Sequence, residues 1–124
     1  MHILAAEDNK INAQILKHIL QGLDLEVTMT GDGGQCVEKL AEEAPGTFQL
    51  ILMDIQMPEV DGLEATRRIR TLEQEELRNI PIYAMTADII PETIAEFERA
   101  GMNGYLAKPI NVADLMTVIE KYGV

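Results

Sequence analysis

Short apolar runs alternate with amphipathic stretches along the whole of this chain of 124 residues. The third and fourth runs have almost no polar interruption, which indicates strands covered on both faces, as in a parallel sheet. The expected strands are residues 3–6, 25–29, 48–53, 80–85 and 105–106. Five strand–helix units in this order predict a doubly wound α/β fold with a five-stranded parallel sheet.

The amphipathic stretches predict five helices, which a doubly wound fold places on both faces of the sheet. In the first helix Ile11, Ile15 and Ile19 lie four residues apart, and leucines at positions 16, 20 and 23 widen this apolar stripe. Gly101 is expected to end the fourth helix and Asn111 to cap the start of the last. The other helices are marked by apolar positions within residues 37–40, 63–72, 90–97 and 112–119. No linker or repeat interrupts the pattern, so we expect residues 1–124 to form one domain.

The chain is strongly acidic, with 10 basic and 21 acidic residues and a net charge of −11. Such a surface is repelled by nucleic acid phosphates and by anionic lipid, so neither is expected as a direct partner. No apolar stretch approaches the roughly 20 residues that span a bilayer. The single cysteine, Cys36, cannot form an internal disulfide and is expected to be a packed residue. These features predict a cytoplasmic protein.

Three carboxylates directly follow two of the predicted strands: Glu7 and Asp8 follow the first, and Asp54 follows the third. Because the carboxyl ends of parallel strands share one edge of the sheet, we expect these side chains to meet there, beside Lys108. Mg²⁺ prefers oxygen ligands and needs only one or two carboxylates. A carboxylate can also attack phosphorus, and Asp54 is the best candidate because it ends the most apolar strand. The sequence therefore predicts Mg²⁺-dependent phosphoryl transfer to Asp54, with Lys108 neutralising charge.

Each of these residues has a plainer interpretation when taken alone. Asp8 is a candidate cap for the helix that begins near Lys10, Asp54 a turn carboxylate, and Lys108 a solvated lysine. Only their joint occurrence at strand ends favours a site.

The chain closely resembles the receiver domain of two-component response regulators, especially receiver modules attached to hybrid sensor histidine kinases. The resemblance runs from end to end and is carried by the strand ends and the turns that follow them. The matching segments are Leu-Ala-Ala-Glu-Asp-Asn at 4–9, Leu-Met-Asp-Ile-Gln-Met-Pro at 52–58, Asp-Gly at 61–62, Ala-Met-Thr-Ala at 84–87 and Gly-Tyr-Leu-Ala-Lys-Pro at 104–109. The resemblance implies a flavodoxin-like sheet with the strand order 2-1-3-4-5.

The resemblance also implies roles for the acidic residues. Asp54 is at a position that resembles that of the family's phosphoacceptor. Glu7 and Asp8 are at positions that resemble those of the acidic pair that holds Mg²⁺. Asp54 itself and the backbone carbonyl of Gln56 complete the expected protein ligands, and Mn²⁺ is a second candidate ion.

Four further positions match family residues that contact the phosphoryl group or respond to its presence. Lys108 is expected to pair with its oxygens, and the Lys108–Pro109 peptide bond to be cis. Thr86 is expected to donate its hydroxyl to the phosphoryl group, and Tyr105 to be the aromatic switch that turns inward. A phosphoryl group adds roughly −1.5 to −2 charge, enough to favour one of two arrangements of the fourth helix, fifth strand and fifth helix.

The implied function is two-component or phosphorelay signalling by a phosphoacceptor domain that is not an enzyme toward other substrates. It catalyses only its own Mg²⁺-dependent phosphorylation and dephosphorylation. The implied donor is a sensor histidine kinase or a histidine phosphotransfer domain, with an output domain or protein downstream. Gln56 and Asp88 are expected to overhang the site and to influence the lifetime of the phosphorylated state.

Three alternatives share some of these features. A phosphohydrolase of the haloacid dehalogenase type generally needs a second aspartate two residues after the nucleophile, where this chain has Gln56. A flavin-binding flavodoxin-like module needs a phosphate cradle after its first strand, where Glu7 and Asp8 would repel phosphate. A receiver used only for docking would not need the complete set of Asp54, Thr86 and Lys108.

Overall fold

The computed structural model describes residues 1–123, in which five parallel strands form one open sheet. The strands are β1 (His2–Ala6), β2 (Glu26–Thr30), β3 (Leu50–Asp54), β4 (Ile82–Thr86) and β5 (Gly104–Ala107). Their order across the sheet is β2-β1-β3-β4-β5, which confirms the flavodoxin-like topology. The winding reverses between β1 and β3, so ligands are expected at the carboxyl ends of these two strands.

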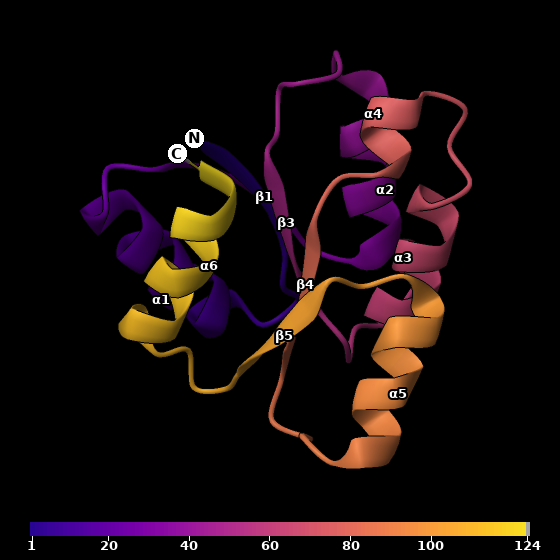
Figure 1. Cartoon of the computed structure of the whole chain (residues 1–124). Helices are drawn as coiled ribbons and strands as arrows, with labels where there is room; N and C mark the ends of the chain where they lie inside the picture. Colours follow the sequence, from indigo (N-terminus) through magenta and orange to yellow (C-terminus); the bar gives the residue numbers. More distant parts are fainter. Residues whose placement is uncertain (124) are drawn as a thin grey trace.

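Helices cover both faces of the sheet, with α1 and α6 on one face and the other helices on the opposite face (Figure 1). The helices are α1 (Lys10–Gly22), α2 (Gly33–Glu42), α3 (Gly62–Ile69), α4 (Glu75–Arg78), α5 (Pro91–Ala100) and α6 (Val112–Gly123). The short α4 is additional to the five helices that the sequence predicted. A single turn of four residues is too short to show a helical period in the sequence.

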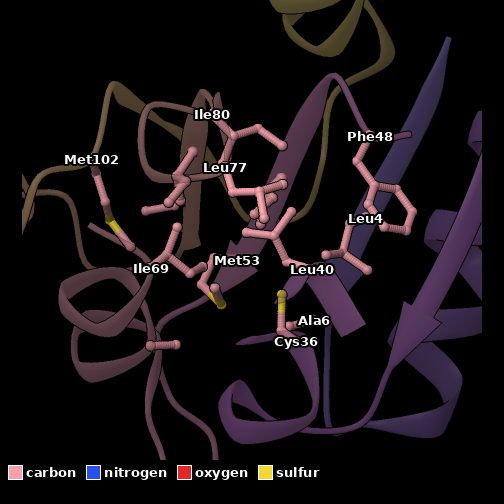
Figure 2. Close-up of a cluster of buried hydrophobic side chains, with 14 of the residues drawn as sticks. Leu4, Ala6, Cys36, Leu40, Phe48, Met53, Ile69, Leu77, Ile80 and Met102 are labelled. Carbon is pink, nitrogen blue, oxygen red and sulfur yellow. The ribbon is translucent and has the colours of Figure 1, made fainter. Parts of the chain in front are cut away.

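The central strands β3 and β4 are buried along their whole lengths, as their continuous apolar character predicted. Successive side chains point to opposite faces of the sheet, so they pack into two separate hydrophobic cores. On one face Leu4 and Met53 pack with Cys36, Leu40 and Ile69 from α2 and α3 (Figure 2). On the other face, strand residues pack with residues of α1 and α6: Ile3, Leu52, Met85, Leu16, Leu20 and Leu115.

The apolar stripe of α1 does not lie wholly against the sheet. Leu16 and Leu20 are buried, whereas Ile11 and Ile15 are 72% and 54% exposed. The periodicity correctly predicts a helix, but the isoleucine row at its N-terminal half faces outward.

The ends of the elements follow local chemistry. Gly101 ends α5 in a left-handed conformation with φ of 102°, as predicted. Asn111 Oδ1 accepts the backbone N–H groups of Ala113 and Asp114 at 2.8 and 3.2 Å, which satisfies the start of α6. β4 begins at Ile82, two residues later than predicted, because Pro81 has no N–H to donate to a ladder. Within residues 1–123, no helix combines the length and the apolar character that crossing a membrane requires.

Candidate functional site

Three carboxylates meet at the carboxyl ends of β1 and β3, as the sequence predicted. The two strands are neighbours in register, with Ala6 beside Met53, so the residues that follow them emerge side by side. One carboxylate oxygen each from Glu7, Asp8 and Asp54 lies within 4.8 Å of the other two. This cluster stands at the reversal of strand order, where doubly wound sheets bind ligands.

Two of the three carboxylates are buried and share a single lysine. Glu7 is 6% and Asp54 4% exposed, whereas Asp8 is exposed. Lys108, which directly follows β5, places Nζ 3.0 Å from Asp54 Oδ1 and 3.2 Å from Glu7 Oε1. Because buried charges are costly unless paired, this ammonium group is a main compensation for both carboxylates.

The electrostatics of the pair follow from this crowding. Burial raises the pKa of Glu7, and the hydrogen bond and charge of Asp54 raise it further, against the opposing effects of the Asn9 N–H and Lys108. Partial burial alone would lower the pKa of Lys108, but bonds and charges from Asp54 and Glu7 outweigh it and the pKa is raised. Lys108 therefore remains protonated at neutral pH, and the site favours an additional cation.

Asn9, rather than Asp8, caps the first helix. Its Oδ1 accepts the N–H of Asn12 at 3.0 Å, and its own N–H donates to Glu7 Oε2 at 3.2 Å. The plainer interpretation of Asp8 as the helix cap is therefore wrong, and its carboxylate is available to the acidic cluster. Asn9 was not predicted as the cap, although an asparagine directly before a helical pattern is a signal that identifies one.

Gln56 lies two residues beyond the end of β3, in the loop that leads to α3. Its backbone N–H donates to Asp54 Oδ1 at 3.3 Å, which fixes the turn directly after the carboxylate. Asp61 ends this loop as the N-cap of α3, with Oδ1 accepting the Glu64 N–H at 2.8 Å.

A cleft of about 120 Å³ lies beside Asp54 and is bounded by the ends of β3, β4 and β5. Thr86 ends β4 at this cleft and is 7% exposed, and its Oγ1 accepts the backbone N–H of Asp88 at 3.0 Å. Gln56 and Asp88 both line the cleft, as expected from their spacing. The Lys108–Pro109 peptide bond is cis, as the resemblance implied.

Tyr105 does not line this cleft. It lies on β5 in register with Ala84 of β4 and is 39% exposed. The structure thus brings together the three carboxylates, Gln56, Thr86 and Lys108, and places Tyr105 on the strand next to Thr86.

A second, larger cavity, which the sequence did not predict, lies next to the cluster. It has a volume of about 330 Å³ and lies between α1 and the loop after β5. Its lining is mainly apolar but includes the site residues Glu7 and Lys108: Glu7, Asn12, Ile15, Leu16, Ile19, Met85, Lys108, Pro109 and Ile110. Ile15 and Ile19, two of the regularly spaced isoleucines of α1, contribute to this lining.

The cluster offers the ligands that a hard divalent cation needs. All three side chains provide carboxylate oxygens, and they surround one space at the open edge of the sheet. Mg²⁺ keeps several waters and takes its protein ligands from a few oxygens, which this partly open edge allows. The residues present therefore fit Mg²⁺, with Glu7, Asp8 and Asp54 as candidate side-chain ligands.

Together these features define a doubly wound α/β domain with an acidic cation site and a paired lysine at its switch point. The family model of the response regulator receiver domain matches residues 3–120, and the chain belongs to this family, whose domains act in two-component and phosphorelay signalling. The expected class of protein is confirmed.

The chain is similar to one segment of much longer histidine kinases. It is 39% identical over 119 residues to the peroxide stress-activated histidine kinase mak1 of Schizosaccharomyces pombe, covering 95% of this chain and 7% of that protein. Across the curated relatives it matches, the chain spans between 5% and 14% of their length.

Solved receiver-domain structures share the whole fold, and two of them bear on the site. The receiver domain of the sensor histidine kinase PA1611 from Pseudomonas aeruginosa, which has a magnesium ion coordinated in its active site cleft, is 37% identical with a TM-score of 0.86, covering 98% of this chain and 95% of that chain. The receiver domain of the response regulator Ssk1 from Saccharomyces cerevisiae, in complex with the histidine phosphotransfer protein Ypd1, is 29% identical with a TM-score of 0.86. That match covers 99% of this chain and 88% of that chain.

Proposed function

We propose that Asp54 accepts a phosphoryl group from a phosphohistidine of a sensor histidine kinase or a histidine phosphotransfer domain. The observation that carries this proposal is the pairing of buried Asp54 with Lys108 inside a cluster of three carboxylates. A carboxylate can act as a nucleophile toward phosphorus, and Asp54, paired with Lys108, lies beside a cleft that can admit a phosphoryl group.

The reaction exchanges one bond of phosphorus for another. An Asp54 oxygen forms a bond to phosphorus as the bond between phosphorus and the donor's imidazole nitrogen breaks, and the imidazole leaves with its electron pair and takes up a proton. Lys108, at the edge of the cleft, moves from the carboxylate to the oxygens of the transferred group. Thr86 turns its hydroxyl toward the same oxygens. Its Oγ1 then no longer accepts the hydrogen bond from the Asp88 N–H.

The metal ion of this site is Mg²⁺, and Mn²⁺ is a substitute with the same oxygen preference. Glu7, Asp8, Asp54 and the backbone carbonyl of Gln56 would hold it. When bound, the ion neutralises charge that develops on the phosphoryl oxygens. The domain uses this site only on itself, for its own phosphorylation and for the hydrolysis that reverses it.

The phosphoryl group acts as a switch through Thr86 and Tyr105. Thr86 leaves space when it moves toward the site, and Tyr105 lies on the adjacent strand, half exposed, where it can turn inward to fill that space. The surface that changes is formed by α5, β5 and α6, which an output domain or protein then recognises.

The phosphodonor docks on α1 beside the site. Ile11 and Ile15 are exposed there, and Ile15 lines the cavity that reaches Glu7 and Lys108. α1 carries Lys10 and Lys17 and no acidic side chain, although the chain as a whole has a net charge of −11. An apolar patch with basic flanks suits an acidic, amphipathic helical partner.

Residues 1–124 act as one phosphoacceptor unit in the cytoplasm, where histidine kinases present their phosphohistidines. The net charge of −11 argues against direct binding to nucleic acid or to anionic membranes.

The proposal is tested by phosphorylation with ³²P-labelled acetyl phosphate. The wild-type protein should incorporate acid-stable, base-labile label with Mg²⁺ and none with excess chelator. Asp54→Asn should abolish the label, whereas Asp114→Asn, at an exposed position of α6, should not change it. Unchanged labelling of Asp54→Asn would show that the acceptor is another residue.

A further inference from the structure

The loop between β3 and α3 carries Gln56 directly beside the candidate metal site, and it must hold its shape for the carbonyl to stay in place. Its two ends are joined, because the Gly62 N–H donates to the Ile55 carbonyl at 3.0 Å. At the far side of the loop Glu59 has a left-handed φ of 62°, which is uncommon for a residue with a side chain.

Gly62 supports the loop at its base. This residue starts α3 and is buried, and a methyl group added to it would overlap the Asp54 backbone carbonyl oxygen. The same methyl group would lie 3.0 Å from Ile55 Cα and from Met53 Cγ. The N-terminus of α3 is therefore pressed directly against the backbone that carries the phosphoacceptor.

Gly33 supports the loop at its far side. It starts α2 and is buried, and its N–H donates to the Val60 carbonyl at 3.1 Å. A methyl group on Gly33 would overlap this same Val60 oxygen and lie 3.0 Å from Ala65 Cβ and the Asp61 carbonyl. The two helices thus hold the loop between them, and both contacts require the absence of a side chain.

A buried threonine of α3 holds Gly62 in position. Thr66 is fully buried, and its hydroxyl donates to the Gly62 carbonyl at 2.8 Å. By contrast, a methyl group on Gly22, near the end of α1, would meet no atom within 4 Å. A position in a helix therefore does not by itself bring a glycine into such close contact.

We propose that Gly33 and Gly62 are positioning residues, which clamp the loop of residues 55–61 so that the Gln56 carbonyl and the Asp54 carboxylate stay in place for Mg²⁺ and the phosphoryl group. This inference rests on the proposed function of the site. Gly33 acts through Val60 and affects the loop that bears Gln56, whereas Gly62 acts on the backbone of Asp54 itself. The two residues should therefore have distinguishable effects.

The test compares Gly33→Ala and Gly62→Ala with the matched control Gly22→Ala. Mg²⁺ affinity is measured by calorimetric titration at a temperature where each variant is folded, and melting temperature and labelling by acetyl phosphate at saturating Mg²⁺ are measured separately. Supporting groups of a metal site typically contribute about 10–100-fold in affinity, so we expect Gly33→Ala to weaken Mg²⁺ binding about 10-fold with a near-normal maximal labelling rate. Gly62→Ala should lower both the affinity and the maximal rate, and Gly22→Ala neither.

Thr66→Val keeps the volume of the side chain and removes only the hydroxyl bond to Gly62, so it decides the question if the alanine variants do not fold. It should weaken Mg²⁺ binding by about 3-fold, less than the about 10–100-fold of a group that supports a ligand directly, because Thr66 acts only through Gly62. Folded variants that melt at lower temperature but bind Mg²⁺ within twofold of the wild type would overturn the inference. A wild-type protein that neither binds Mg²⁺ nor takes up label would instead overturn the proposed function.

Discussion

Lys108 Nζ lies 3.0 Å from Asp54 Oδ1, although the two residues are 54 positions apart in the chain. The same ammonium group is 3.2 Å from Glu7 Oε1, so one cation serves two buried carboxylates. A divalent metal bound by these carboxylates would provide the same compensation. Lysine and metal ion are therefore alternative as well as cooperating sources of positive charge, and their roles can be separated by mutation.

Lys108→Met should leave Mg²⁺ binding at least as strong as in the wild type, because it removes a competing cation and no ligand. Labelling by acetyl phosphate should fall about 100-fold, the usual effect of deleting one charged donor to a transition state. Without metal the variant should melt at lower temperature, and Mg²⁺ should stabilise it more than it stabilises the wild type. Calorimetric titration, labelling and thermal melts measure these three quantities.

Lys121→Met is the matched control, because this lysine is exposed on α6, and it should change none of the three. Loss of Mg²⁺ affinity in Lys108→Met comparable with that in Asp8→Ala would contradict the separation of roles.

Tyr105 should lose exposure when the acceptor is occupied. The acyl phosphate analogue beryllofluoride with Mg²⁺ should shift the ¹⁹F resonance of 3-fluorotyrosine at position 105 and reduce its response to solvent. Thr86→Ala should weaken this response because the hydroxyl that links the site to β4 is missing. Thr117→Ala removes an exposed hydroxyl on α6 and should leave the response intact. An unchanged Tyr105 signal in the occupied wild-type protein would exclude this residue as the switch.

The sheet and the acidic site could be predicted from the sequence because both depend on local patterns and one topological rule. Continuous apolar runs identify β3 and β4, and the parallel arrangement then places Glu7 and Asp54 at one edge. No information about side-chain packing is needed for this step.

Features that depend on packing could not be predicted in the same way. The spacing of Ile11, Ile15 and Leu16 indicates a helix, but only the docking of α1 on the sheet determines that the two isoleucines are exposed. Arg70 is a second example: its guanidinium bonds to backbone and side-chain oxygens 8 to 33 residues away in the chain. Nothing near Arg70 in the sequence marks those partners.

Arg70→Met should destabilise the fold without changing the site. Its guanidinium donates to the carbonyls of Gly101, Arg78 and Ile80 and to Asn103 Oδ1, at distances from 2.7 to 2.9 Å. Leaving such acceptors without a donor should lower the free energy of unfolding by about 2–4 kcal/mol, as measured by urea denaturation. The matched control is Arg67→Met on the exposed side of α3, which should cost under about 1 kcal/mol. An equal cost for both variants would show that the Arg70 network contributes nothing specific.

Cys36 should be unreactive in the folded protein at pH 8. Burial raises the pKa of its thiol from 9.0 to about 12, and the thiolate is the reactive form. Reaction with a disulfide reagent should therefore be at least about 100-fold slower than in denatured protein. Rapid reaction of the folded protein would contradict the burial.

The same pKa shift predicts a loss of stability in alkali. The folded state holds the thiol proton more tightly than the unfolded state, so this contribution is complete below about pH 9 and is lost as the pH rises toward 12. Between these values the free energy of unfolding of the wild type should fall more steeply with pH than that of Cys36→Ala. The difference in slope should correspond to the release of up to about one additional proton on unfolding. Urea denaturation at several pH values measures both slopes, and parallel slopes would contradict the assignment.

Ile15→Glu should separate docking of a protein donor from the chemistry at Asp54. Ile15 is 54% exposed and lines the cavity between α1 and the loop after β5, so a carboxylate there adds repulsion where an acidic partner is expected. Transfer from a phosphorylated histidine phosphotransfer domain should fall about 10-fold or more, whereas labelling by acetyl phosphate should stay within twofold. Met116→Glu, at a 41% exposed position of α6, should affect neither reaction. Equal losses with both phosphodonors would place the defect in the site itself, and unchanged transfer from the protein would show that α1 is not the docking face.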